Sequence, residues 1–239
     1  MHTHAAEKTI EGVQNAYNAI AEHFSQTRYA PWKSVDDLLD AYVQSGENVV
    51  DIGCGNGRFV ESFRLRGIHY TGTDLSPELL AQAEKKYPAE KFVRANMEHL
   101  PFPDGSFDHA LLIASFHHIP SYEKRAATLK EIARIIKSGG MIMMTNWNLH
   151  QTRYWRLHVR TYIARCFRDS TLDRGDVLVP WKSQTGELKA ERYYHSFTRA
   201  ELQALGKESR LTMVEQYYEL HGKHVAARKG QNIVTVLKK

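Results

Sequence analysis

The sequence lacks the features of membrane-spanning, disulfide-stabilised and zinc-binding proteins. Its 239 residues include two cysteines, too few for a disulfide framework or a zinc site, so a reducing cytoplasm and no bound metal are expected. No apolar run approaches the ~18 residues of a membrane helix, and residues 1–12 lack the apolar core of a signal peptide. The net charge of +5, with a pI near 9.1, favours an anionic partner.

Apolar runs and amphipathic segments alternate along the chain. The runs predict strands at residues 47–53, 69–76, 91–97, 107–115, 141–147, 212–220 and 232–238. Helices are predicted at residues 10–25, 35–44, 57–67, 76–88, 121–140 and 198–209. The helix predicted at residues 76–88 has Ser76 as its N-cap and Pro77 in its first turn. This alternation predicts an α/β fold, a doubly wound and mostly parallel sheet with helices on both faces.

We expect one domain over residues 1–239, with two additions to the sheet. Residues 1–45 are predicted to form a helical cap over the substrate, and residues 148–197 a basic insertion before the last two strands. Within the insertion, residues 150–168 hold five arginines, two histidines and no acid. If this segment is helical, one face carries Arg153, Arg156 and Arg160, a stripe typical of RNA contact, although a solvated helix face would look the same. The other face carries Trp155, Val159 and Tyr162 and is expected to pack on the domain.

A glycine-rich turn after the first strand predicts a nucleotide-type ligand. Gly53, Gly55 and Gly57 let the backbone turn sharply and approach a ligand closely. The second strand ends in Asp74, whose carboxylate can bond two ribose hydroxyls. The spacing differs from that of dinucleotide sites and no P-loop lysine follows, so a ligand with a ribose but no pyrophosphate is favoured.

The segments "VVDIGCGNGRF", "GTDLS", "ANMEHLPFPDGSFDHAL" and "KSGGMIMMT" resemble class I S-adenosylmethionine-dependent methyltransferases over residues 45–146. This resemblance implies a seven-stranded Rossmann-like sheet and S-adenosylmethionine as the cofactor. It also implies that Gly53 and Gly55 lie against the methionine part, with Asp51 just beneath. Asp74 would hold the ribose, Asn96 and Met97 the adenine, and the carbonyl of Ala114 the methionine ammonium.

A narrower resemblance concerns the acceptor. The segments "IAEHFSQTRYAPW", "SFHHI", "DVLVPW" and "RYYHSFTRAEL" are similar to the tRNA wobble-uridine methyltransferases, which esterify the carboxylate of 5-carboxymethyluridine in the anticodon. The resemblance implies tRNA, and neither DNA nor a membrane, as the partner. Eukaryotic relatives also work with a small zinc-binding activator at the sheet edge, and the strand at 91–97 is the expected edge here.

Methylation of a carboxylate predicts positioning residues and no general base, because a carboxylate is ionised at neutral pH. Arg28 and Arg192 are the candidates to orient it, since the planar guanidinium matches a carboxylate. Either His117 or His118 is expected beside the transferred methyl, and His117 is favoured, by resemblance, as the pocket residue that contacts the uracil. The structural alternative is that one histidine packs in the wall and the other lies at the surface. Further substrate candidates are Tyr29, Asp176, Tyr194 and His195. Surface ion pairing of Arg28, a loop role for Asp176 and core packing of Tyr194 are the structural alternatives.

Two other functions fit the same cofactor motifs. The first is a small-molecule methyltransferase that acts on an acid, phenol or quinone. The second is a non-catalytic scaffold that keeps the fold, which the intact glycine turn and Asp74 argue against. The arginine-rich insertion and the "RYYHSF" segment favour the tRNA enzyme.

Overall fold

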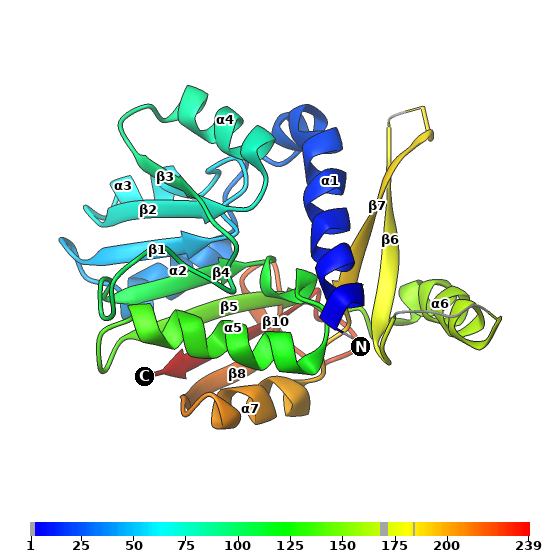
Figure 1. The fold of residues 1–239 in the computed structure, drawn as a ribbon. Helices are drawn as coiled ribbons and strands as arrows, with labels where there is room; N and C mark the ends of the chain where they lie inside the picture. Colours follow the sequence, from blue (N-terminus) through cyan, green and yellow to red (C-terminus); the bar gives the residue numbers. More distant parts are fainter. Residues whose placement is uncertain (1–2, 168–171, 184) are drawn as a thin grey trace.

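A twisted eight-stranded sheet forms the centre of the computed structural model, which describes residues 3–167, 172–183 and 185–239 (Figure 1). Its strand order is β3-β2-β1-β4-β5-β10-β8-β9. The strands are β1 (Asn48–Ile52), β2 (His69–Asp74), β3 (Lys91–Arg94), β4 (His109–Ile113), β5 (Met141–Trp147), β8 (Thr212–Leu220), β9 (Lys223–Val225) and β10 (Asn232–Lys238). Strands β1 to β5 are parallel, and β10 runs antiparallel between β5 and β8.

The predicted α/β class is therefore confirmed. The sheet has one strand more than the seven expected, because the short β9 turns back and pairs with the end of β8. Strand β3 lies at an edge of the sheet, as expected.

Helices cover both faces of the sheet because successive strand residues point to opposite sides. In β1, Val50 and Ile52 join the core under α5 and α7, whereas Val49 joins the core under α2, α3 and α4. The helices are α1 (Thr3–Thr27), α2 (Lys33–Tyr42), α3 (Val60–Arg64), α4 (Pro77–Lys86), α5 (Tyr122–Ile135), α6 (Trp155–Phe167) and α7 (Arg199–Glu208). The predicted cap of α4 is confirmed, since the Ser76 hydroxyl accepts a hydrogen bond from the backbone N–H of Leu79 at 3.2 Å.

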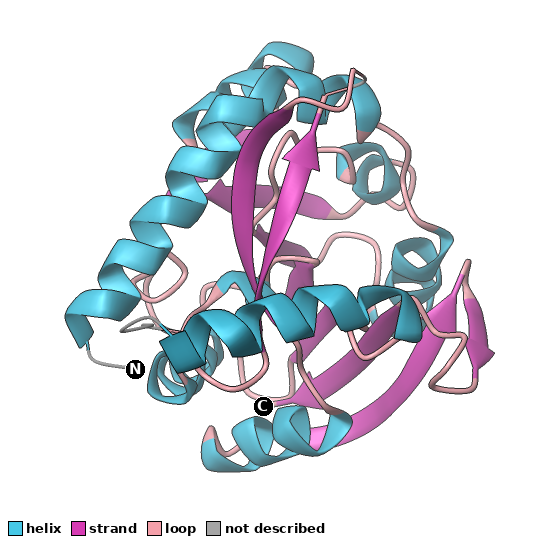
Figure 2. Cartoon of the chain, turned by 90° about the vertical axis from the view of Figure 1, so that its right-hand side faces the viewer, coloured by secondary structure: helices cyan, strands magenta, loops and turns pink. Residues whose placement is uncertain are grey.

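The segment between β5 and α7 forms a separate two-stranded ribbon. Its antiparallel strands are β6 (Asp176–Lys182) and β7 (Leu188–His195), and β7 stands beside α1 (Figures 1 and 2). Helix α6, with the short 3-10 turn η2 (Thr152–Tyr154) before it, packs against β6.

The expected packing of α6 was wrong. Trp155 is 57% exposed, Val159 43% and Tyr162 66%. Leu157 and the preceding Tyr154 pack against the ribbon instead. Arg153 lies in η2 and not in α6, so the expected three-arginine helical face is interrupted.

The first two helices have different roles in the architecture. Helix α1 lies along the open side of the sheet and contacts both α4 and β7, whereas α2 packs into the core on one sheet face. Within the described ranges, no helix combines the length and apolar character needed to cross a membrane.

Candidate functional site

A cavity lies at the carboxyl ends of β1, β2 and β4, under α1 and β7. The strand order reverses between β1 and β4, and ligands of open α/β sheets bind at such a switch point. One half of the cavity is lined by the glycine turn and the ends of β2 and β3. The other half is lined by side chains of α1, η1 (Phe116–His118) and β7. The site thus has a nucleotide-shaped half and an aromatic half.

The glycine turn and Asp74 are held together by backbone hydrogen bonds. The Asp74 carboxylate accepts from the N–H groups of Gly55 and Ser76, each at 2.8 Å. Burial raises the pKa of Asp74, and these amides oppose the shift. Gly53 has φ of +77°, and an added Cβ would lie 2.3 Å from the Cβ of Ser115, so this position requires glycine.

Two buried charged groups beneath the turn have unused bonding capacity. Asp51 accepts a hydrogen bond from the Tyr70 hydroxyl at 3.1 Å, but its Oδ1 is buried without a partner in the described structure. Burial raises its pKa to about 7. Arg58 lines the cavity at 9% exposure and lies over the ring of Trp32, with no ion pair to any described carboxylate. Burial lowers its pKa to about 10, so it stays charged near neutral pH.

Asn96, Met97 and Ala114 also line the cavity. The Asn96 side-chain oxygen accepts from the Glu98 backbone N–H at 3.0 Å, and its second lone pair remains for a ligand. Ala114 has φ of +53°, and its N–H donates to the Thr145 carbonyl at 3.0 Å. This unusual backbone conformation directly follows β4, where the cofactor's methionine part was expected.

In the aromatic half, Arg192 is buried inside a cage of rings. Its guanidinium carbon lies 4.6 Å from the ring centre of Trp181, 5.2 Å from Tyr194, 5.9 Å from Tyr17 and 6.0 Å from Trp147. The residue is 4% exposed. No described carboxylate pairs with it, its Nε has no partner among the described groups, and its side-chain hydrogen bonds go to the hydroxyls of Tyr17 and Tyr194. A buried guanidinium without a counter-charge is a site for an anion.

The structure places His118, and not the favoured His117, at the cavity. The His118 Nδ1–H donates to the Tyr193 carbonyl at 2.7 Å, so its Nε2 accepts from the Tyr17 hydroxyl at 2.8 Å. His117 is 1% exposed and stacks on Tyr194 behind the cavity wall. Burial lowers both pKa values, that of His118 to about 3, so both rings are neutral. The tight η1 turn, which points adjacent side chains in different directions, decides between the two.

Arg28 and Tyr29 follow the end of α1, and the structure separates them. Arg28 lines the cavity, with its guanidinium carbon 5.2 Å from the Trp181 ring centre. Its side chain is exposed and bonds the carbonyl of Thr27. Tyr29 is 66% exposed and does not line the cavity. Arg28 is therefore placed at the rim, while Arg192 is the interior cation.

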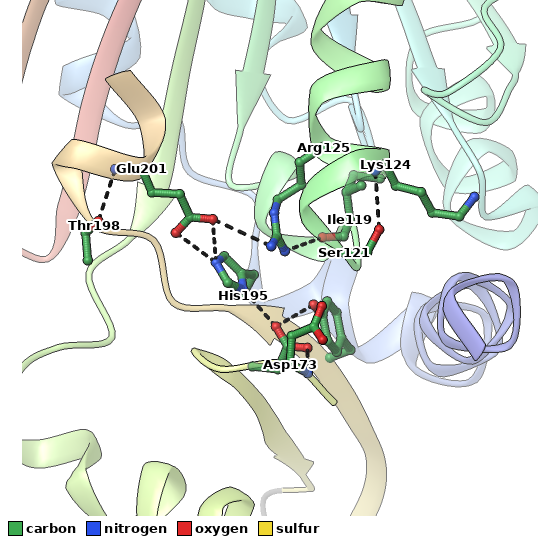
Figure 3. Close-up of polar contacts among 10 residues, drawn as sticks. Ile119, Ser121, Lys124, Arg125, Asp173, His195, Thr198 and Glu201 are labelled. Carbon is green, nitrogen blue, oxygen red and sulfur yellow. Dashed lines mark hydrogen bonds and ion pairs between the residues drawn. The ribbon is translucent and has the colours of Figure 1, made fainter. Parts of the chain in front are cut away.

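Asp176 and His195 lie outside the cavity, contrary to their expected substrate role. Asp176 accepts from the Tyr193 hydroxyl and from His195 Nδ1, both at 2.7 Å, while His195 Nε2 bonds Glu201 at 2.9 Å. Figure 3 shows Glu201 between His195 and Arg125, whose nitrogen lies 3.6 Å from the carboxylate. Burial opposes protonation of His195, but the two carboxylates outweigh it and raise its pKa. This network links the base of the ribbon to α5 and α7.

Of the four further substrate candidates, Tyr194 alone lines the cavity. Tyr194 and Arg192, two positions before it in β7, both point into the cavity because alternate residues of a strand share a face. Asp176 and His195 form a buried ion pair with each other, so neither charge is left for a substrate.

Sequence reasoning did not single out Arg58 or Tyr17, and it named His118 only as the alternative to the favoured His117. Arg58 directly follows the glycine turn, a position that would have drawn attention to it. Tyr17 occupies an ordinary amphipathic position in α1, and nothing in the sequence distinguishes it from a packing residue.

The residues of the nucleotide-shaped half fit S-adenosylmethionine. Arg58 lines the cavity without an ion pair and suits a carboxylate. Asp51 does not line the cavity, but its unpartnered Oδ1 is buried beneath the glycine turn and is an acceptor suited to an ammonium. The Asp74 carboxylate suits ribose hydroxyls. The orphaned groups thus match the ligand that the sequence motifs imply.

Comparisons with known proteins agree with this geometry. Residues 50–144 match a family described as methyltransferase domain. A Schizosaccharomyces pombe protein named tRNA (carboxymethyluridine(34)-5-O)-methyltransferase is 30% identical over 237 residues, covering 92% of this chain and 96% of the relative. A Saccharomyces cerevisiae protein of the same name is 35% identical over 147 residues, but the match covers 62% of this chain and 52% of the yeast protein.

Solved structures show the same fold. A crystal structure of a SAM-dependent methyltransferase from Methanosarcina mazei has a TM-score of 0.69 and 24% identity, covering 84% of this chain and 96% of that one. A putative methyltransferase from Haloferax volcanii, solved in complex with a Trm112 methyltransferase activator, has a TM-score of 0.64 and 20% identity. That match covers 94% of this chain and 96% of the other.

Proposed function

The chain belongs to the family of tRNA carboxymethyluridine methyltransferases, and from this membership we propose how its residues carry out the reaction. The activity is S-adenosylmethionine-dependent methylation of 5-carboxymethyluridine at position 34 of tRNA, the wobble position. The product is the methyl ester of the side-chain carboxylate.

The observation that carries the proposal is the buried, unpaired guanidinium of Arg192 inside the aromatic half of the cavity. A substrate carboxylate would supply the counter-charge that no described residue provides. The rings around Arg192 suit a flipped-out uracil, because base faces stack on aromatic side chains. Of these rings, Tyr17, Trp147 and Tyr194 line the cavity, and Tyr194 is the nearest of the three to the guanidinium.

The cofactor is held by the other half of the cavity, and when bound it supplies a methyl group on a positively charged sulfur. We assign its adenine to Asn96 and Met97, its ribose to Asp74, and its amino-acid end to Gly53, Gly55, Ala114, Asp51 and Arg58. Arg58 would bind the carboxylate of that end, and Asp51, buried beneath the glycine turn, would complement its ammonium.

The protein's own contribution is orientation. The attacking carboxylate is ionised at neutral pH, so no side chain has to remove a proton. Arg192 orients the carboxylate, and Arg28 adds positive charge at the rim. Neutral His118, locked by Tyr17 and Tyr193, offers a polar wall without a second buried charge. Because the ester is neutral, the ion pair with Arg192 is lost in the product, which favours its release.

The test is methyl transfer from labelled S-adenosylmethionine to tRNA carrying 5-carboxymethyluridine, followed by mass spectrometry of the nucleosides. The same tRNA with unmodified uridine at position 34 is the control, because it lacks the carboxylate. Ester formation on the first tRNA alone supports the proposal. Cofactor binding without any ester, with and without an activator protein, would shift the assignment to a small-molecule acid.

We further propose that the free edge of β3 accepts a small zinc-binding activator protein in the cytoplasm. Unpaired strand edges can add a strand from a partner, and the Haloferax volcanii methyltransferase of the same fold was solved with an activator. Strand β3 lies at the sheet edge next to β2, which carries Asp74. Strand pairing there would stabilise the ribose end of the site. Co-expression with a Trm112-type protein and measurement of cofactor affinity tests this.

A further inference from the structure

The outer side of α6 exposes apolar side chains that a folded domain usually buries. Trp155, Val159, Tyr162 and Ile163 are spaced by four, three and one residues, and they are between 43% and 66% exposed. This spacing places them on one side of the helix. The opposite side contacts the ribbon through Leu157. We call these four residues, together with Arg153, Arg156 and Arg165, the α6 surface.

The charge of the α6 surface has one sign. Residues 150–167 contain four arginines and no acid. Arg160 bonds Glu191 at 2.6 Å, but no described carboxylate pairs with Arg153, Arg156 or Arg165. The guanidinium of Arg156 lies 5.7 Å from the Trp155 ring centre. Aromatic rings interleaved with unpaired guanidinium groups match a strand of nucleic acid, whose bases stack and whose phosphates are anionic.

The position of the α6 surface relates it to the site. Helix α6 packs on β6, and β6 pairs along its length with β7 (Figure 1). Strand β7 carries Arg192 and Tyr194, which line the cavity. A tRNA whose wobble base enters the cavity has its neighbouring loop nucleotides outside, beside the ribbon. Unpaired loop bases are the part of an RNA that proteins stack upon.

We propose that the α6 surface binds the RNA flanking the target nucleotide, with Trp155 and Tyr162 stacking on unpaired bases and Arg153, Arg156 and Arg165 contacting phosphates. This inference rests on the proposed function, because it takes tRNA as the substrate. A second copy would present the same positive charge and is disfavoured, whereas RNA offers both phosphates for the unpaired guanidinium groups and unpaired bases for the exposed rings.

Two sets of variants separate the stacking from the charge. Trp155→Ala with Tyr162→Ala removes the rings, and Arg156→Gln with Arg165→Gln removes two positive charges. The matched charge control is Lys207→Gln with Lys238→Gln. Both lysines are exposed, and Lys238 pairs with the first residue of β5, at the sheet end opposite the cavity.

The measurement is fluorescence anisotropy with an anticodon stem-loop RNA at several salt concentrations. Loss of the two rings should weaken binding by at least roughly thirtyfold, because each stacked base contributes about 1–3 kcal/mol, with the salt dependence unchanged. Loss of the two arginines should reduce the slope of log affinity against log salt by roughly 1.4, or 0.7 for each phosphate contact on a single strand. The lysine control should change neither quantity.

Unchanged RNA affinity in both variant sets overturns the proposal, as does an equal effect of the lysine control. Sedimentation of the wild type tests for self-association. If the wild type self-associates, the ring variant does not, and the RNA affinity of the variant is unchanged, the surface binds a second copy of the chain and not RNA. Thermal unfolding and S-adenosylhomocysteine binding show whether the variants remain folded. RNA binding is measured without catalysis, so wild-type protein that binds RNA but forms no ester, with or without an activator protein, refutes the proposed function and not this surface.

Discussion

Replacing Arg192 by glutamine tests the central assignment of the site. The change keeps hydrogen-bond donors and most of the side-chain length but removes the charge. Arg192 is 4% exposed, so a carboxylate bound to it is shielded from water. Removing one partner of a buried, hydrogen-bonded charge pair costs about 2–5 kcal/mol. A value near 3 kcal/mol corresponds to a loss of roughly a hundredfold in kcat/KM, at about 1.4 kcal/mol for each factor of ten.

Stability should respond differently from activity. Without substrate the guanidinium has no described counter-charge, and its contacts are to the rings of Trp181, Tyr194, Tyr17 and Trp147 and to the hydroxyls of the two tyrosines. Such cation–π contacts contribute about 0.5–2 kcal/mol, which is offset by the cost of burying the charge. The Tm of Arg192→Gln should therefore lie within a few degrees of the wild-type value.

The assay is steady-state methyl transfer to tRNA carrying 5-carboxymethyluridine, with Arg28→Gln as the matched control. Arg28 carries the same charge at the cavity rim, where an exposed contact contributes less than about 1 kcal/mol and its loss costs less than roughly fivefold. Affinity for S-adenosylhomocysteine should be unchanged in both variants. Equal losses in the two variants, or a weaker cofactor affinity in Arg192→Gln, would refute the assignment of Arg192 to the carboxylate.

Other groups give separate tests. Burial raises the pKa of Asp51 to about 7, and a ligand ammonium favours the ionised carboxylate. Calorimetry should therefore show that the affinity for S-adenosylhomocysteine increases as pH rises through 7. In Asp51→Asn this affinity should not change with pH. Gly53→Ala should lower the free energy of unfolding, measured with urea, by at least about 2 kcal/mol, because Gly53 has a positive φ and an added Cβ would clash with Ser115. The control Gly12→Ala should raise it by about 0.5–1 kcal/mol, because Gly12 lies in α1 with open space around it. The raised pKa of His195 stabilises the fold below its ordinary value near 6.5, and that stabilisation is lost as pH rises through the folded pKa. Thermal scans should thus show a Tm deficit in His195→Gln that is larger at pH 6 than at pH 9, and an equal deficit at both would show that the ring is neutral.

The nucleotide-shaped half of the cavity could be predicted from the sequence because short segments at strand ends form it. Gly53 and Gly55 follow β1 directly, and Asp74 ends β2, so each lies at a strand end that the apolar pattern locates. Parallel strands bring their carboxyl ends to one edge, which places these residues together without further information.

The aromatic half depended on contacts between distant segments. Tyr17 and His118 bond across 101 positions of sequence, and Trp181 and His23 across 158. Whether His117 or His118 faces the cavity depends on the η1 turn, which periodicity does not resolve. Asp176 and His195 had the chemistry of substrate ligands, but their pairing in the register of β6 with β7 directs them to each other.

The sequence by itself determined where the functional residue types lie along the chain: which strands end in acids, where the glycine turn lies, and where arginines are concentrated. These are properties of neighbouring residues, whose steric and hydrophobic preferences act locally. Only the tertiary structure decided which charges are neutralised inside the protein and which remain for a ligand. That distinction separates Arg192 from Arg125, because a charge is available only when no distant segment brings a carboxylate to it, and packing alone sets those distances.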